Sequence, residues 1–152
     1  MAKTDYRKTD LAGLGPFFAI PHSVIDSTGY QALNPSAIRL LLDICRQYSG
    51  RNNGRLSPTW ELMKDKGWKN QTTLNKAKKE LRNSKLITVT RVGSRRKGDC
   101  ELWALNWYPL HWHVSMDIEP TGHDYMGFLD LKDAKIDPIT ERSKPPALRI
   151  VA

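Results

Sequence analysis

Residues 70–107 decide the fold of this chain, and they read NQTTLNKAKKELRNSKLITVTRVGSRRKGDCELWALNW. Near the start of this stretch, Leu74, Ala77 and Leu81 recur at helical spacing and fall within one narrow arc. The asparagine that opens the stretch is a favourable N-cap, because its side chain can accept hydrogen bonds from free backbone N–H groups. The pattern therefore predicts a helix over residues 71–83.

A β-hairpin is predicted directly after this helix. Residues 87–91, ITVTR, are rich in β-branched side chains and alternate in polarity, which is typical of a strand. Residues 100–107 alternate again. The connection over residues 92–99 contains Gly-Ser-Arg-Arg-Lys-Gly, in which the glycines allow a sharp turn. The hairpin is thus expected to carry a strongly basic tip.

An amphipathic helix is also predicted upstream, over residues 34–48. Asn34 is expected as its N-cap, and Pro35 occupies the first helical position, where the missing N–H does no harm. One face is apolar, and its expected core residues are Ala37, Leu40, Leu41, Ile44 and Tyr48.

The segment between these two helices predicts a turn, a short strand and another helix, which makes the helix over residues 71–83 the third of the core. The sequence Asn52-Asn53-Gly54 is a turn signal, and a short strand is expected at residues 55–56. Ser57 is expected to cap a helix that has Pro58 at its first position and ends at Gly67. The residues expected to point inward from this helix are Trp60, Leu62 and Met63.

The order of these elements defines an α+β fold of the winged helix-turn-helix type, with a three-helix core and a β-hairpin wing. The expected parts are an N-terminal arm over residues 1–20, a winged-helix domain over residues 21–109, and an irregular C-terminal extension over residues 110–152. A short helix is expected within residues 21–33, with Val24, Ile25 and Tyr30 as its anchors.

Positive charge is concentrated in one third of the chain. The net charge is +8, yet residues 51–100 hold 14 Lys or Arg against 4 Asp or Glu, and the rest holds 10 against 12. Localised charge of this kind attracts a polyanion, although a basic surface can also serve solubility alone. This segment contains the predicted third helix and the hairpin, so a nucleic-acid contact is expected there. Further basic residues surround these two elements: Arg51, Arg55, Lys64, Lys66 and Lys69.

The predicted contact residues lie on the outward arc of the third helix and on the wing. A helix fits the major groove of B-DNA, where Asn or Gln can pair with adenine and lysines meet phosphates. Arginine on a wing can enter a narrow minor groove. The predicted DNA-binding residues are Gln71, Thr72, Asn75, Lys76, Lys79, Arg82, Arg91, Arg95, Arg96 and Lys97. The alternative is an ordinary solvated helix face and a solvated hairpin tip.

Other functional classes find little support in the sequence. No P-loop, HExxH, GxSxG or dinucleotide motif is present, so no enzyme and no cofactor are expected. His111, His113, Asp117 and His123 match no strong metal-ligand spacing, and no metal is expected. Two lone cysteines and the lack of a signal-peptide pattern or long apolar run favour a cytoplasmic protein without a membrane partner.

Several motifs resemble small winged-helix proteins of phages and other mobile elements, and the N-terminal DNA-binding domains of phage and plasmid replication initiators. They are Asn52-Asn53-Gly54-Arg55-Leu56-Ser57, Gly67-Trp68, Leu74-x-x-Ala77-x-x-x-Leu81, Leu86-Ile87 and Leu102-Trp103-Ala104-Leu105-Asn106-Trp107. The resemblance implies contact with double-stranded DNA through Thr72, Asn75, Lys76 and Lys79 and through a wing with Arg95, Arg96 and Lys97. It implies a transcriptional regulator or a replication accessory factor.

A second function stays open from the sequence alone. The winged helix could be the scaffold of a protein-interaction module, such as a phage inhibitor of a host defence complex. The aromatic C-terminal extension, with Trp112, Tyr125 and Phe128, would then dock a host or phage protein. A homodimer is compatible with DNA binding, because helix-turn-helix proteins often contact two half-sites.

Overall fold

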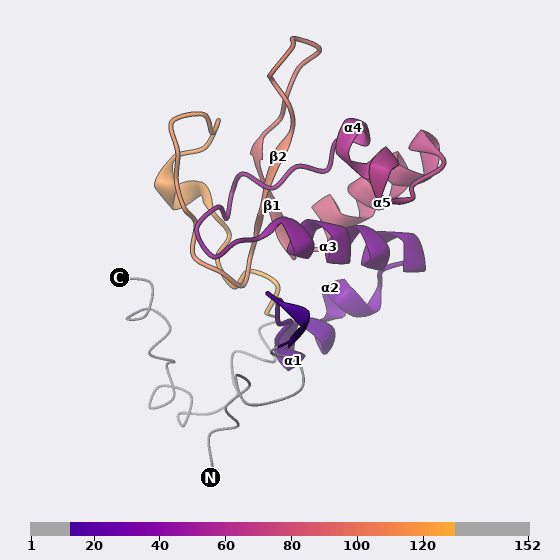
Figure 1. The fold of residues 1–152 in the computed structure, drawn as a ribbon. Helices are drawn as coiled ribbons and strands as arrows, with labels where there is room; N and C mark the ends of the chain where they lie inside the picture. Colours follow the sequence, from indigo (N-terminus) through magenta and orange to yellow (C-terminus); the bar gives the residue numbers. More distant parts are fainter. Residues whose placement is uncertain (1–12, 130–152) are drawn as a thin grey trace.

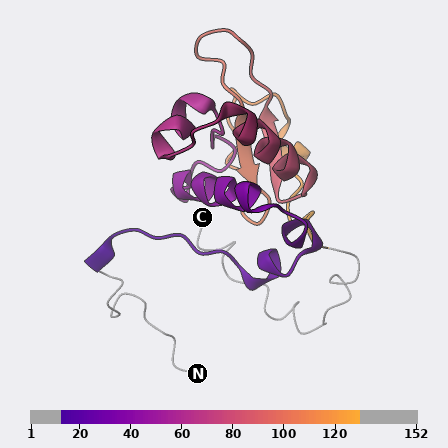
Figure 2. The same ribbon diagram turned by 90° about the vertical axis from the view of Figure 1, so that its right-hand side faces the viewer.

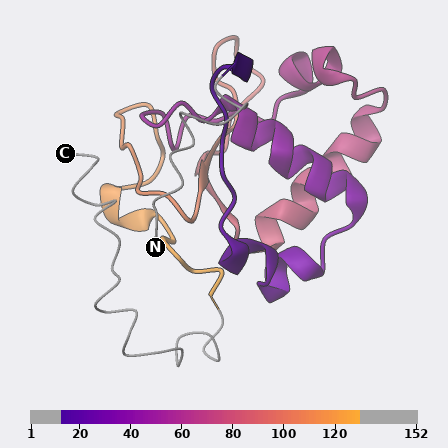
Figure 3. The ribbon, with the colours of Figure 1, turned by 60° about the horizontal axis from the view of Figure 1, so that its bottom comes forward.

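The structure, a computed structural model, describes residues 13–129 and is of the α+β class (Figure 1). Helices pack on one side of an antiparallel hairpin, and the segment that follows the hairpin lies on its other side (Figures 1 and 3). The α-helices are α1 (His22–Ile25), α2 (Thr28–Gln31), α3 (Pro35–Gln47), α4 (Trp60–Met63) and α5 (Gln71–Asn83). Two short 3-10 helices are η3 (Lys64–Lys66) and η4 (Pro120–Gly122). The strands are β1 (Ile87–Arg91) and β2 (Leu102–Leu105).

Helices α3 and α5 form the core as their apolar spacing predicted. They pack against each other through the buried residues Ala37, Leu40, Leu41, Ile44 and Cys45 of α3 and Leu74, Ala77 and Leu81 of α5. Asn34 is the N-cap residue of α3 as predicted, but the side-chain capping bond expected of it is absent. Its side chain makes no capping bond and instead donates to Glu80 of α5, so it links the two helices.

The predicted start of the middle helix is wrong. The helix begins at Trp60, because the backbone of Ser57 is held by the side chain of Gln47 through two hydrogen bonds of 2.8 Å each. Leu62, expected inside, is 46% exposed, whereas Met63 is buried. The helix continues through η3 and stops at Gly67, whose φ of +90° is the left-handed conformation that the predicted stop needs.

The hairpin pairs Ile87 with Leu105 at one end and Arg91 with Leu102 at the other. Its second strand is shorter than predicted. The strand expected at residues 55–56 appears as a bridge between Leu56 and Trp103, with backbone bonds of 3.1 and 2.6 Å. On the opposite edge, the N–H of Asp117 donates to Thr90 at 2.7 Å. Both edges of the hairpin are therefore partly covered by other segments, which limits pairing with other chains.

The helix expected within residues 21–33 is two short helices, α1 and α2. Ser27 separates them: its hydroxyl donates to the carbonyl of Val24 at 2.6 Å and accepts from the N–H of Tyr30 at 3.3 Å. Val24 is buried as expected, while Ile25 and Tyr30 are half-buried. The preceding segment passes the C-terminal end of α3 (Figures 2 and 3), where Tyr108 donates to the carbonyl of Ala19.

A fully buried asparagine joins the turn after α3 to the hairpin and to the segment that follows it. The side-chain amide of Asn53 donates to the carbonyls of Leu105, Tyr108 and Pro109 at 2.9 to 3.1 Å. Its oxygen accepts from the N–H of Leu105 at 2.7 Å. The residue was predicted only as part of a turn, and its role in the core is a finding of the structure.

Residues 110–129, which we call the C-terminal strap, pack against the hairpin. The N–H of Met126 donates to Asn106, and Phe128 is buried with its ring edge on Trp107. The sequence suggested a surface made of Trp112, Tyr125, Met126, Phe128 and Leu129. Phe128 does not belong to that surface because it is part of the core, and the remainder of the extension, residues 130–152, lies outside the described residues.

Candidate nucleic-acid interface

The outward arc of α5 is open to solvent. Asn70 caps the helix as predicted, since its side-chain oxygen accepts from the N–H groups of Thr72 at 2.8 Å and Thr73 at 3.3 Å. The C-terminal strap lies on the other side of the hairpin and leaves this arc uncovered (Figure 1). The exposed residues of the arc and its margins are Gln71, Thr72, Asn75, Lys76, Lys79, Arg82 and Asn83.

Arg82 has an intramolecular partner that the sequence did not predict. Its guanidinium donates two hydrogen bonds to one carboxylate oxygen of Glu101, one of them 3.0 Å long from Nε. Lys78 lies 2.7 Å from the other oxygen, and Trp103 Nε1 donates to Glu101 at 2.9 Å. Burial raises the pKa of the Glu101 carboxyl, but these hydrogen bonds outweigh burial and hold the pKa below its ordinary value.

These contacts define which flank of α5 faces the hairpin. Residues three and four apart lie on one stripe of a helix, so Gln71, Asn75, Lys78 and Arg82 share a stripe. Lys78 and Arg82 contact Glu101, which immediately precedes β2, so this stripe is the side of α5 that faces the hairpin. Asn75 belongs to the same stripe and therefore lies on the hairpin side of the helix. Figure 2 shows α5 toward the viewer with the hairpin tip rising beyond it. The polar arc and the hairpin thus border one common surface.

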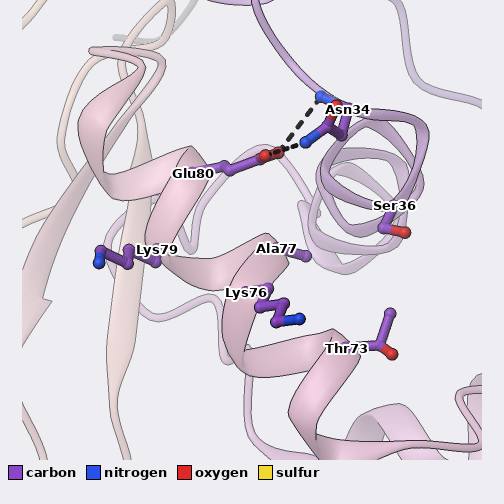
Figure 4. A pocket seen from close by; sticks show the side chains of 7 residues that line it. All are labelled: Asn34, Ser36, Thr73, Lys76, Ala77, Lys79 and Glu80. Atoms are coloured by element: carbon purple, nitrogen blue, oxygen red, sulfur yellow. Dashed lines mark hydrogen bonds between the residues drawn. The ribbon is translucent and has the colours of Figure 1, made fainter.

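The opposite flank of α5 faces the start of α3. Asn34 donates to Glu80 through its side-chain amide and, at 3.2 Å, through its backbone N–H. A hollow of about 330 Å³ lies beside this contact and is lined by Asn34, Ser36, Thr73, Lys76, Ala77, Lys79 and Glu80. In Figure 4 the side chain of Lys79 extends away from α3, on the other side of the helix from Asn34. Lys79 is therefore directed outward rather than into the helix contact.

The tip of the hairpin is basic and exposed, as predicted. Arg95, Arg96 and Lys97 are all solvent-exposed. Gly93 and Gly98 flank them with φ values of +78° and +85°, which favour glycine. The turn closes on itself through backbone bonds, including that from Ser94 N–H to the carbonyl of Asp99 at 2.9 Å. The tip can thus approach a ligand without breaking contacts to the body of the protein.

Arg91 stands apart from the other predicted contact residues because it braces the hairpin. Its Nε donates to the carbonyl of Cys100 at 2.8 Å, and its Nη2 lies 3.3 Å from the Cys100 sulfur. The same Nε lies 3.7 Å from Oδ1 of Asp99 in an ion pair. The Arg91 side chain is only 16% exposed. The structure therefore places Arg91 within the neck of the hairpin rather than on the open surface.

The turn between η3 and α5 is fixed by Trp68. The indole N–H donates to Asp43 at 2.7 Å, and the guanidinium of Arg39 lies 5.1 Å from the indole ring centroid. Arg39 also donates to the carbonyl of Lys66 at 3.0 Å. These bonds tie the start of α5 to α3, so the exposed arc of α5 is presented by a well-braced helix.

The contacts of Glu101 and Lys78 are the part of this surface that the sequence did not reveal. The two residues are far apart in the chain, and no local pattern connects an isolated carboxylate with a helix that precedes it. Lys78 lies at the margin of the core stripe of α5, where its alkyl chain is largely covered. The only signal was the presence of a single acidic residue directly before an apolar strand.

The histidines are engaged separately rather than gathered at one centre. His111 accepts from the N–H of Asn53 at 3.2 Å, His113 contacts Ser115, and His123 lies 3.2 Å from the carbonyl of Leu105. Burial lowers the pKa of His111, and nearby Arg55 lowers that pKa further; burial also lowers the pKa of His123. Within residues 13–129, no group of three or more His, Cys, Asp or Glu side chains could hold a metal ion.

Both cysteines are free thiols. Cys45 is buried in the core, and burial raises its pKa to about 12, so it has little thiolate character. Cys100 is half-buried beside Arg91 in the hairpin.

Comparisons of the chain with models of protein families, with curated proteins and with solved structures find no match. In the part of the chain that the structure describes, none of the helices has the length and apolar character that crossing a membrane would need.

Proposed function

We propose that this chain is a winged helix-turn-helix protein that binds double-stranded DNA. Helix α5 would enter the major groove, and the β1–β2 hairpin would act as a wing whose tip follows the backbone or the minor groove. In biological terms we propose a transcriptional regulator or a replication accessory factor of the phage or mobile-element type. The observation that carries the proposal is the common surface of the polar arc of α5 and the basic tip.

The charges on this surface fit a phosphate backbone. Lys76, Lys79, Arg95, Arg96 and Lys97 are exposed, and none of them has a carboxylate within ion-pair distance among the described residues. Cations of this kind can exchange water and counterions for phosphate oxygens at little cost in internal contacts. Thr72 and Asn75 are short polar residues in the first turns of α5. In a helix bound in the major groove, residues near the N-terminal end usually contact base edges.

Fluorescence anisotropy with a labelled duplex tests the proposal at several salt concentrations. If about five phosphates are neutralised, affinity should fall roughly 10²- to 10³-fold between about 50 and 200 mM salt. A variant with Arg95, Arg96 and Lys97 replaced by glutamine should bind more weakly and show a shallower salt dependence. No binding of the wild-type chain to any duplex at low salt would reject the function.

A second candidate is a protein-interaction module, and one observation favours it. Trp112, Val114 and Tyr125 of the C-terminal strap are 47%, 78% and 43% exposed, so the strap offers several apolar side chains to a partner. A partner retained by the wild-type chain after nuclease treatment, and lost with Trp112→Ala, would support this function. Retention of the same partner by Trp112→Ala would count against docking at the strap.

A further inference from the structure

A buried carboxylate connects α5 to the neck of the hairpin. Glu101 is 9% exposed and immediately precedes β2. Both of its oxygens are occupied: one by Lys78, the other by Arg82 and by the indole N–H of Trp103. Lys78 and Arg82 belong to α5, whereas Glu101 and Trp103 belong to the hairpin, so the carboxylate is a bridge between two elements.

The bridge lies at the point where the hairpin leaves the body of the protein. Gly93, on the opposite side of the neck, is so close that a Cβ on it would lie 2.6 Å from the N–H nitrogen of Glu101. Beyond the neck, the hydrogen bonds of the tip join tip residues to one another, such as the bond from the N–H of Asp99 to the carbonyl of Arg96 at 3.1 Å. The direction of the tip relative to α5 therefore depends on the contacts at the neck.

We propose that Glu101 is a positioning residue that holds the wing tip at a fixed spacing from the outward arc of α5, so that both reach one duplex. The inference rests on the proposed DNA-binding function and deepens it. Lys78 and Arg82 act through Glu101 and do not contact phosphate themselves. When α5 and the wing tip both contact one duplex, affinity is higher if the tip is already oriented once α5 has bound, because less freedom is lost in the second contact.

A double-mutant cycle tests this coupling. The variant Arg95→Gln/Arg96→Gln removes the tip cations, and its loss of affinity is measured in the wild-type background and in Glu101→Gln. Glutamine keeps the shape of the side chain and an acceptor for Trp103 but removes the charge. We expect the tip variant to lose roughly ten-fold in the wild type and at most about three-fold in Glu101→Gln, since an unfixed tip contributes less. Equal losses in both backgrounds would overturn the proposal.

Glu119→Gln is the matched control, because Glu119 is an exposed carboxylate of the C-terminal strap. This variant removes one negative charge, as Glu101→Gln does. It therefore measures how much the affinity for DNA rises merely because the protein has become more positive. The tip variant should lose the same roughly ten-fold in this background as in the wild type. A reduced loss in Glu119→Gln would show that net charge, rather than position, explains the result and would overturn the proposal.

The salt dependence of Arg82→Gln separates positioning from direct contact. A cation that neutralises a phosphate lowers the slope of log affinity against log salt by about 1 when it is removed. A positioning role predicts weaker binding with an unchanged slope, and a decrease of about 1 would overturn it. If Glu101→Gln fails to fold, Arg82→Gln replaces it in the cycle, because it removes one of the two ion pairs from α5 to the carboxylate, while Lys78 and Trp103 keep the carboxylate paired.

Residual dipolar couplings of the free protein make the test independent of DNA. In the wild type, amides of the hairpin tip and of α5 should share one orientation, and in Glu101→Gln the tip should lose it. A tip that keeps its orientation in the variant would overturn the inference. A wild-type chain that binds no duplex would reject the proposed function instead, while the couplings would still decide whether Glu101 holds the hairpin.

Discussion

At the scale of single residues, Asn53 shows how one polar side chain can organise a junction. It is fully buried, yet each of its side-chain hydrogen-bonding atoms is used, by Leu105 and by the carbonyls of Tyr108 and Pro109. Buried polar groups are stable when they are paired and costly when they are not. The turn, the second strand and the start of the strap thus depend on one amide.

Replacing Asn53 with alanine should lower the free energy of unfolding by about 3 kcal/mol, since it leaves buried carbonyls and an N–H without partners. Urea denaturation followed by circular dichroism measures this change. Asn83→Ala, at an exposed position of α5, is the control and should change stability by at most about 0.5 kcal/mol. An Asn53→Ala midpoint equal to that of the wild type would contradict the assigned role.

His111 and His123 make stability depend on pH. Their pKa values are lowered in the folded protein, chiefly by burial, so the unfolded chain binds more protons at mildly acidic pH. The stabilisation is complete above the ordinary histidine pKa and decreases as the pH falls through that value toward the folded-state value. The hydrogen bond to the Leu105 carbonyl and then the charge of Asp124 oppose this effect on the pKa of His123, whereas Arg55 adds to it at His111.

The free energy of unfolding should therefore fall between pH 7.5 and pH 5.5 at constant salt. The double variant His111→Asn/His123→Gln supplies a neutral acceptor for the Asn53 N–H and a neutral donor for the Leu105 carbonyl, and it should flatten this dependence. Denaturant titrations at a series of pH values provide the measurement. The same slope in the variant and the wild type would assign the pH dependence to other groups.

At the scale of elements, the hairpin is shaped by two glycines in different surroundings. Gly93 and Gly98 both have φ near +80°, but only Gly93 lies against another backbone, at Glu101. A Cβ at Gly98 would meet nothing within 4 Å. The neck is thus restricted by both conformation and space, and the tip by conformation alone.

Gly98→Ala should cost about 1 kcal/mol from backbone strain, and Gly93→Ala should cost at least about 1 kcal/mol more from the steric clash. Thermal unfolding of the two variants gives the comparison, in which each serves as the control for the other. If Gly93→Ala were as stable as Gly98→Ala, the neck would not be closely packed.

At the scale of the whole molecule, the exposed cations of α5 and of the hairpin tip border one surface, while the strap lies on the other side of the hairpin (Figure 1). In the tertiary structure Arg82 is paired with Glu101 and Arg91 is mostly covered in the neck, while Lys76, Lys79 and the tip cations have no carboxylate partner among the described residues. If this surface binds DNA, its residues should divide into those that contact phosphates and those that contact bases.

Lys79→Gln should weaken binding to all duplexes about equally and lower the salt slope by about 1, since a phosphate contact carries no sequence information. Asn75→Ala should instead change the preference among sequences by about 1–3 kcal/mol at the affected base pair. Competition titrations against a randomised duplex library distinguish these results. Arg46→Gln, an exposed cation near the end of α3, controls for net charge. A uniform loss in Asn75→Ala would contradict a base contact.

The sequence by itself determined the elements with a clear local signal. The spacing of Leu74, Ala77 and Leu81 and the cap at Asn70 specified α5 to the residue, and the β-branched run specified β1. The exposure of the predicted arc followed from the same spacing, because the periodicity of apolar residues indicates which side of a helix is buried. The exposure of the tip followed from its glycines and its charged residues. Local signals failed at Ser57, where the backbone bonds to Gln47 override a strong helix-start pattern.

Only the tertiary structure decided which polar side chains are partners. The bridge from Glu101 to Lys78 and Arg82, the bonds of Asn53, and the burial of Phe128 all join residues that are distant in the chain. Such contacts have no periodicity, because their energy depends on burial and on the relative position of whole elements. Composition showed that the central segment is basic; the packing of α5 on the hairpin decided which of its charges are free.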